Sequence, residues 1–128
     1  MLDRPSPVEI LKAASTSLRD NIAPVLAPAQ AFRLRIILNA LGLVVRELEY
    51  EKGHGASDEL RRLQAILGSD DDSIPALTKQ LCARITAGDT GFEDAALIEH
   101  LWLTTIDKIE VDQPQYAGYK HALEMMRK

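Results

Sequence analysis

The sequence predicts an all-α protein, a single-domain bundle of five or six helices over residues 1–128 around a buried central helix at about residues 29–52. The stretch Phe32 to Tyr50 is apolar on nearly every side, which is typical of a helix surrounded by other helices. The other segments repeat apolar residues at helical spacing, and none alternates over a length that would indicate a strand. A chain of 128 residues, 46% of them hydrophobic, can form one domain with a real core.

The first helix is predicted to begin after Ser6, with Pro7 at its first position and Glu9 closing a capping box, and to run to about Asn21. Pro24 and Pro28 then separate it from the central helix.

The remaining helices are delimited by caps and glycines. Gly53 is expected to end the central helix with a left-handed cap, and Ser57 to cap a third helix that stops at Gly68. A solvated loop, SDDDS, precedes a fourth helix that Gly88 closes. A capping box at residues 90–93 starts the fifth helix, which Pro114 ends, and a last helix carries Tyr116, Tyr119, Leu123 and Met126.

The central helix carries one polar stripe. At about 100° per residue, its polar side chains fall within roughly 80°, with Gly42 on the same line: Arg35, Asn39, Arg46 and Glu49. One interpretation is structural, because buried charges need partners inside the fold. The other is a ligand site in which Arg35, Asn39 and Arg46 hold a carboxylate, phosphate or CoA-linked anion.

The fifth helix offers partners for the structural interpretation. Its Asp112 falls near the middle of the apolar face by the same count, an unusual position for a carboxylate. We therefore expect Asp112 to be a buried ion-pair partner of Arg35 or Arg46, with Asp107 as second choice.

Composition excludes several functions. With 15 basic and 19 acidic residues the net charge is -4, which argues against nucleic acid as the main partner. The one cysteine, Cys82, is expected to be a buried, inert thiol in a reducing compartment. The N-terminus does not resemble a signal peptide, and the longest apolar run is short of the roughly 18 residues that span a bilayer. These features predict a cytoplasmic protein that does not enter a membrane.

No candidate for catalysis appears. His54, His100 and His121 are expected at the surface, and His121 with Glu124 forms at most half of a metal site. No nucleophile elbow, zinc motif or phosphate loop occurs. We expect no metal, no cofactor and no turnover by the isolated chain. The C-terminal part instead suggests a protein-binding surface, because Tyr and Met are frequent at interfaces: Tyr116, Tyr119, Met125 and Met126.

Two groups of short motifs resemble a known family. They are DRP followed by EIL near the N-terminus and DKIEVDQPQYA at residues 107–117, flanking a central helix with NAL and RELE. Together these are similar to a bacterial family of small uncharacterised helical domains, whose genes neighbour aminoglycoside-phosphotransferase-like kinases and acyl-CoA dehydrogenases. Where that family commonly has Asn before the proline, this chain has Gln113, a poorer helix cap.

The resemblance implies an accessory or interaction domain that binds such a kinase or dehydrogenase, with a second copy of the chain as a further candidate partner. The alternative function is a small-molecule binder that uses the Arg stripe. The chain is not itself the phosphotransferase, because none of its histidines has an aspartate two residues on and it is about half the length that two kinase lobes need.

Overall fold

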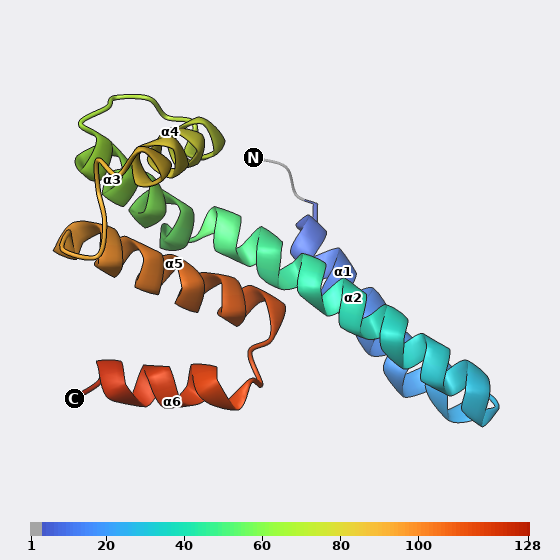
Figure 1. Cartoon of the computed structure of the whole chain (residues 1–128). Coiled ribbons are helices and arrows are strands. Elements are labelled where there is room, and N and C mark those ends of the chain that lie inside the picture. Colours follow the sequence, from blue (N-terminus) through green and yellow to red (C-terminus); the bar gives the residue numbers. More distant parts are fainter. Residues whose placement is uncertain (1–3) are drawn as a thin grey trace. The chain divides into compact units, whose positions relative to one another are not determined.

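The structure, a computed structural model, describes residues 4–128, except for the side chain of His54. Six α-helices and no strand form the described chain, which confirms the all-α prediction. The chain divides into two compact units, one ending at Lys52 and the other spanning Gly53–Lys128 (Figure 1). The single domain over residues 1–128 stays a prediction.

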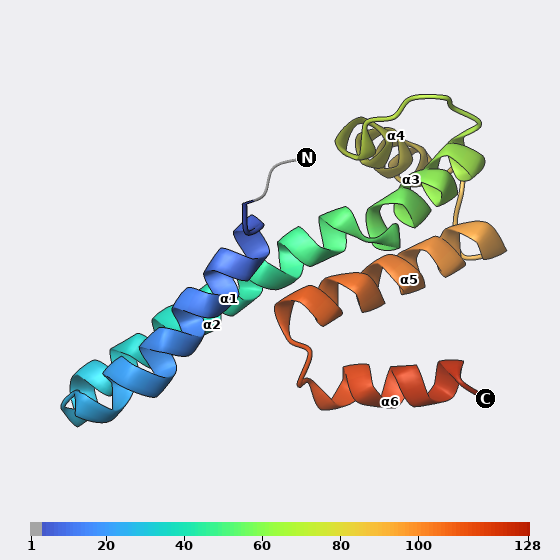
Figure 2. The ribbon, with the colours of Figure 1, turned by 180° about the vertical axis from the view of Figure 1, so that it is seen from behind.

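The first unit is a helical hairpin of α1 (Pro7–Ser17) and α2 (Pro28–Lys52), which lie side by side in both views (Figures 1 and 2). The predicted capping box is present. The Ser6 hydroxyl accepts from the Glu9 amide at 3.2 Å, and the Glu9 carboxylate accepts from the Ser6 amide at 2.7 Å. A π-helical turn at Leu18–Ile22 and a 3-10 turn at Ala23–Val25 connect the two helices, with Pro24 in the second turn.

The prediction of a helix buried on nearly every side is not confirmed for α2. Of its 25 residues only Leu34 and Val45 are buried, whereas Phe32, Ile36 and Ile37 are each more than half exposed. The physical reason is that α1 covers one face of α2 and a two-helix hairpin has nothing to cover the other. By length and composition α2 also meets the requirement for a membrane span, which core helices of soluble proteins meet too, so a chain outside the membrane stays a prediction.

The second unit is built from α3 (His54–Leu67), α4 (Ile74–Ala87), α5 (Ala95–Asp112) and α6 (Ala117–Met126). Its main core joins α3, α4 and α5 through Leu63, Leu77, Leu81 and Leu97. Arg84 of α4 adds a hydrogen bond to the Ile66 carbonyl at 3.1 Å. A second, smaller core of Ile106, Tyr119 and Ala122 holds α6 against α5.

Two helices of this unit end at the glycines predicted from the sequence. Gly68 and Gly88 cap α3 and α4 with φ of 63° and 79°, a region that side chains with a Cβ rarely adopt. The starts of two helices differ from prediction. Gly53 has φ of -84° and precedes α3, which begins at His54 rather than after Ser57. Helix α5 is capped by Asp94, which accepts from the amides of Ala96 and Leu97, so the capping box expected at residues 90–93 is wrong.

Candidate functional site

The polar stripe of α2 lies on the surface of the first unit. Arg35 and Asn39 are exposed, and the Arg35 guanidinium lies 5.2 Å from the centre of the Phe32 ring, within range of a cation–π contact. Arg46 is half-buried and has interactions of its own; its guanidinium lies close to Gly42, where an added Cβ would come within 3.3 Å of it. Glu49 binds Lys12 of α1 at 2.5 Å. Ligand binding by Arg35, Asn39 and Arg46 therefore stays a prediction, at a surface where two of the three side chains are exposed.

Two surface hollows belong to the second unit instead. One, of about 380 Å³, is lined by Asp58, Arg61, Arg62 and Ala65 of α3. The other, of about 230 Å³, is lined by Ile109, Asp112, Gln113 and Tyr116 where α5 ends. None of the stripe residues lines either hollow.

The two expected ion-pair partners have different positions. Asp112 is exposed at the end of α5, which corrects the expectation that it is buried. It is the last residue of α5, where the helix gives way to a turn closed by the hydrogen bond from the Tyr116 amide to the Gln113 carbonyl. Asp107 is half-buried and pairs with Arg62 of α3, with 3.7 Å between Oδ2 and Nη2. A pairing of either carboxylate with Arg35 or Arg46 would join the two units and stays a prediction.

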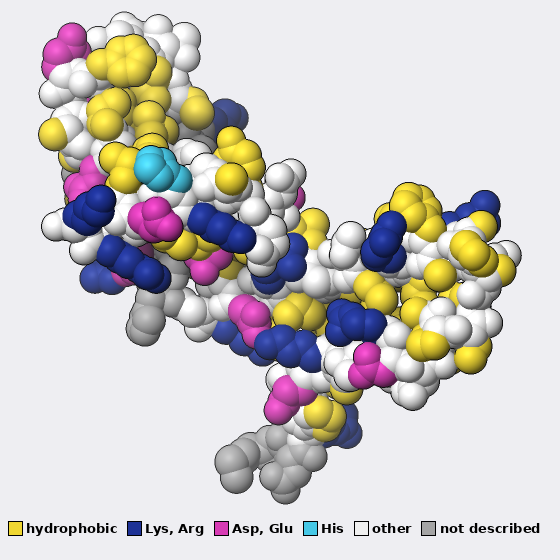
Figure 3. Space-filling view, turned by 90° about the horizontal axis from the view of Figure 1, so that it is seen from below, with side chains coloured by type: hydrophobic (Ala, Val, Ile, Leu, Met, Phe, Trp, Pro, Cys, Tyr) yellow, Lys and Arg dark blue, Asp and Glu magenta, His cyan; other side chains and the backbone are white. Residues whose placement is uncertain are grey.

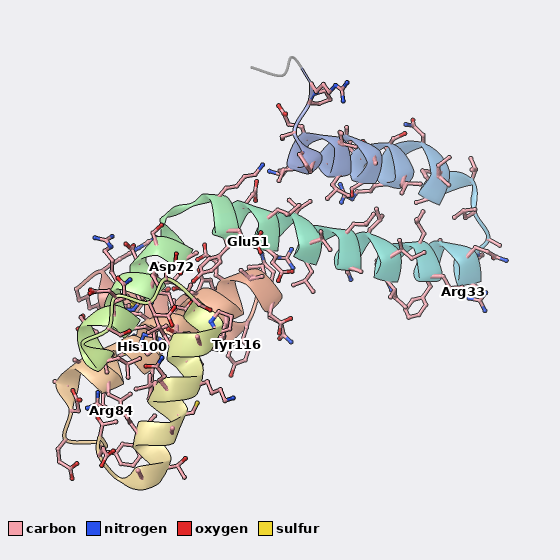
Figure 4. All side chains as sticks on the ribbon, turned by 90° about the horizontal axis from the view of Figure 1, so that it is seen from above. Arg33, Glu51, Asp72, Arg84, His100 and Tyr116 are labelled. Atoms are coloured by element: carbon pink, nitrogen blue, oxygen red, sulfur yellow. The ribbon has the colours of Figure 1, made fainter. Side chains whose placement is uncertain are left out.

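Arg62 and Asp107 belong to a polar cluster between α3 and α5 that the sequence did not predict. His100, Thr104 and Asp107 lie four and three residues apart, on one side of α5. His100 and Thr104 are only 4% and 8% exposed, although His100 was expected at the surface. We call Arg62, His100, Thr104 and Asp107 the α3–α5 polar cluster; Figure 4 labels His100 within the second unit.

This cluster is incompletely hydrogen-bonded. In residues 4–128, the buried side-chain polar atoms without a hydrogen bond to another protein atom are Nε and Nη2 of Arg62, Nδ1 of His100 and Oγ1 of Thr104. An unsatisfied buried group costs about 1–3 kcal/mol, and buried water commonly supplies the missing partner. The spacing of polar residues on α5 was the one signal of this cluster in the sequence. That spacing does not show which side of α5 is buried, because burial there depends on α3.

The surroundings of His100 favour its neutral form. Burial, followed by the positive charge of Arg62, lowers the pKa of the His100 imidazole; Lys108 acts in the same direction and Glu59 opposes it. The cluster contains no thiol, since Cys82 of α4 is exposed and lies outside it. The expected burial of that thiol is wrong. No group of three or more metal-ligating residues occurs in the described part of the chain.

We expect His100 to make the protein less stable in mild acid. Because its pKa is lower when folded, the unfolded chain takes up a proton first as the pH falls below about 6.5, and folding loses stability until the folded imidazole is also protonated. One proton limits this slope to about 1.4 kcal/mol per pH unit. Urea unfolding of His100→Leu between neutral and mildly acidic pH should show a flatter dependence than the wild type.

The matched control for this prediction is His121→Leu, which removes an exposed imidazole on α6. It should keep the pH dependence of the wild type. An equal slope for His100→Leu and the wild type would contradict a buried, neutral His100.

The four C-terminal residues expected at a partner surface divide into two kinds. Tyr116, Met125 and Met126 are 55%, 61% and 50% exposed, as a contact surface requires. Tyr119 is 7% exposed and packs in the core between α5 and α6, so its expected role at a partner surface is wrong. Its burial raises the pKa of the Tyr119 hydroxyl, and the Glu110 carboxylate adds to the effect.

Comparison with known proteins gives one family. The model of a domain of unknown function, DUF6285, matches residues 24–116, well over half of the chain. The chain belongs to this family. The match runs from the turn before α2 to the residue before α6, so it includes the α2 stripe and the α3–α5 polar cluster. No curated protein and no solved structure compared with the chain matches it.

Proposed function

We propose that this protein is a non-catalytic interaction domain, in which an apolar face of α5 binds another protein. The observation that carries the proposal is the orientation of α5. The helix turns His100 and Thr104 inward, while Ile98, Leu101 and Trp102 are 39%, 44% and 48% exposed. At about 100° per residue the exposed apolar residues lie roughly opposite the buried polar ones.

Such an arrangement favours a partner on physical grounds. Apolar area contributes about 25 cal/mol per Å² when it is removed from water. Trp is also among the residue types enriched at the hot spots near the centre of interfaces. Tyr116, Met125 and Met126, at the start and end of α6, are further exposed apolar side chains of this unit. Figure 3, a view from below, shows hydrophobic side chains (yellow) grouped on the surface of the second unit.

The partner is proposed from the resemblance to domains encoded beside kinases and dehydrogenases. We infer that the α5 face binds either the aminoglycoside-phosphotransferase-like kinase or the acyl-CoA dehydrogenase of the same locus, in the bacterial cytoplasm. The small-molecule alternative has less support, because neither hollow described above contains Arg35.

The test is direct binding of the purified chain to each of these two purified proteins by calorimetry. Trp102→Glu should weaken binding at least about tenfold, since it places a charge in an apolar contact. Phe92→Glu is the matched control, because Phe92 is 93% exposed but lies outside α5, and it should bind like the wild type. Failure of both proteins to bind, or turnover of a CoA ester or hydroxy acid by the chain alone, would overturn the proposal.

A further inference from the structure

A second apolar surface lies on α2, in the first unit. Six residues follow one line along this helix at alternating spacings of four and three, the pattern by which helices pair: Arg33, Ile37, Ala40, Val44, Glu47 and Glu51. All six are exposed. We call them the α2 seam.

The seam is not the face that α1 occupies. The buried residues of α2, Leu34 and Val45, lie on another side of the helix, and in residues 4–52 they are the only buried ones. Phe32, Ile36 and Leu43 border the seam, and the first two are 54% exposed. Figure 3 shows hydrophobic side chains reaching the surface along this hairpin. A pair of helices with two buried side chains has little core of its own, so the seam is expected to be covered.

The charged residues of the α2 seam indicate what covers the seam. The seam has a basic residue, Arg33, at its start and two acidic ones, Glu47 and Glu51, at its end. Arg33 and Glu51 lie about five helical turns, or roughly 27 Å, apart, and Figure 4 labels them at opposite ends of α2. Neither is in a salt bridge described within the first unit, whereas the neighbouring Glu49 is paired with Lys12.

The spacing of the seam residues is the same in both directions along the helix. Spacings of four, three, four, three and four are symmetric about residue 42, so the seam matches a second, antiparallel copy of itself. In that register Arg33 faces Glu51 of the second copy, and Ala40 faces Val44. Ile37, which lies one turn from Arg33 on the same helix, faces Glu47. A parallel pair would instead place Arg33 against Arg33 and Glu51 against Glu51, which is repulsive.

We propose that the α2 seam is a homodimer interface, in which two copies of the chain pair their α2 helices antiparallel about a two-fold axis near Gly42. Each Arg33–Glu51 contact then occurs twice, as two-fold symmetry requires. Two α1–α2 hairpins joined in this way form a four-helix bundle, which buries the apolar centre of the seam. The surface is separate from the α5 face, so the dimer does not depend on the proposed function.

The experiment measures the oligomeric state of the full chain by sedimentation equilibrium at micromolar concentrations, with circular dichroism to confirm that each variant folds. The wild type is expected to dimerise. Arg33→Glu and Glu51→Arg should each weaken the dimer about tenfold, because two attractive contacts become two repulsive ones. A mixture of these two variants should form heterodimers, and the double variant should regain most of the lost affinity.

The matched control is Arg19→Glu, which makes the same change of charge at an exposed residue outside α2 and should dimerise like the wild type. Several results would overturn the proposal. These are a monomeric wild type, a monomer that binds vesicles of phosphatidylcholine and phosphatidylglycerol through α2, and a dimer that the Arg33 and Glu51 variants leave unchanged.

Discussion

Leu77→Ala is expected to lower the free energy of unfolding of the second unit by about 3 kcal/mol. Leu77 is fully buried where α4 meets α3, in contact with the cluster that includes Leu63, Leu81 and Leu97. Removing its side chain deletes buried methyl groups and leaves a cavity, because helices tied together by Arg84 and the Ile66 carbonyl close in only partly. Urea unfolding followed by circular dichroism measures the change.

Leu101→Ala is the matched control for this prediction. It makes the same substitution on α5, at a side chain that is 44% exposed, and should cost less than about 1 kcal/mol. Equal losses for the two variants would mean that the core of the second unit is not the Leu63–Leu77 cluster.

Tyr119→Ala is expected to release α6 from α5, with a loss of about 3 kcal/mol in the stability of that contact. Tyr119 is the largest member of the small core with Ile106 and Ala122, and half-buried Ile109 and Leu123 pack on it. Because so few side chains hold α6, the substitution should act locally. Hydrogen exchange should become fast in α6 while the amides of α3 and α4 stay protected.

Tyr116→Ala provides the comparison three residues away. Tyr116 caps the start of α6 without a side-chain hydrogen bond and its ring lies over Gly118, mostly in solvent. Its removal should leave α6 protected. If the α6 amides exchange equally slowly in Tyr119→Ala and Tyr116→Ala, the result would contradict the buried position of Tyr119.

Local sequence patterns were enough to predict the helices and most of their ends. These depend on contacts within three or four residues, such as the Ser6–Glu9 capping box and the left-handed turns at Gly68 and Gly88. Both were predictable because the cap and the groups it satisfies lie in the same turn. That the chain belongs to a family of uncharacterised domains was predictable as well.

Which side of each helix is buried depends instead on how the helices pack against one another. Helix α2 has apolar residues on two faces, and a count along the sequence treats both as core, although α1 covers only the one with Leu34 and Val45. On α5 the polar His100 and Thr104 are buried on the side of the helix where Arg62 of α3 pairs with Asp107, a contact between residues far apart in the chain. Hydrophobic periodicity indicates how apolar each face of a helix is. Burial depends on which other helix packs against that face, and such contacts join residues far apart in the sequence.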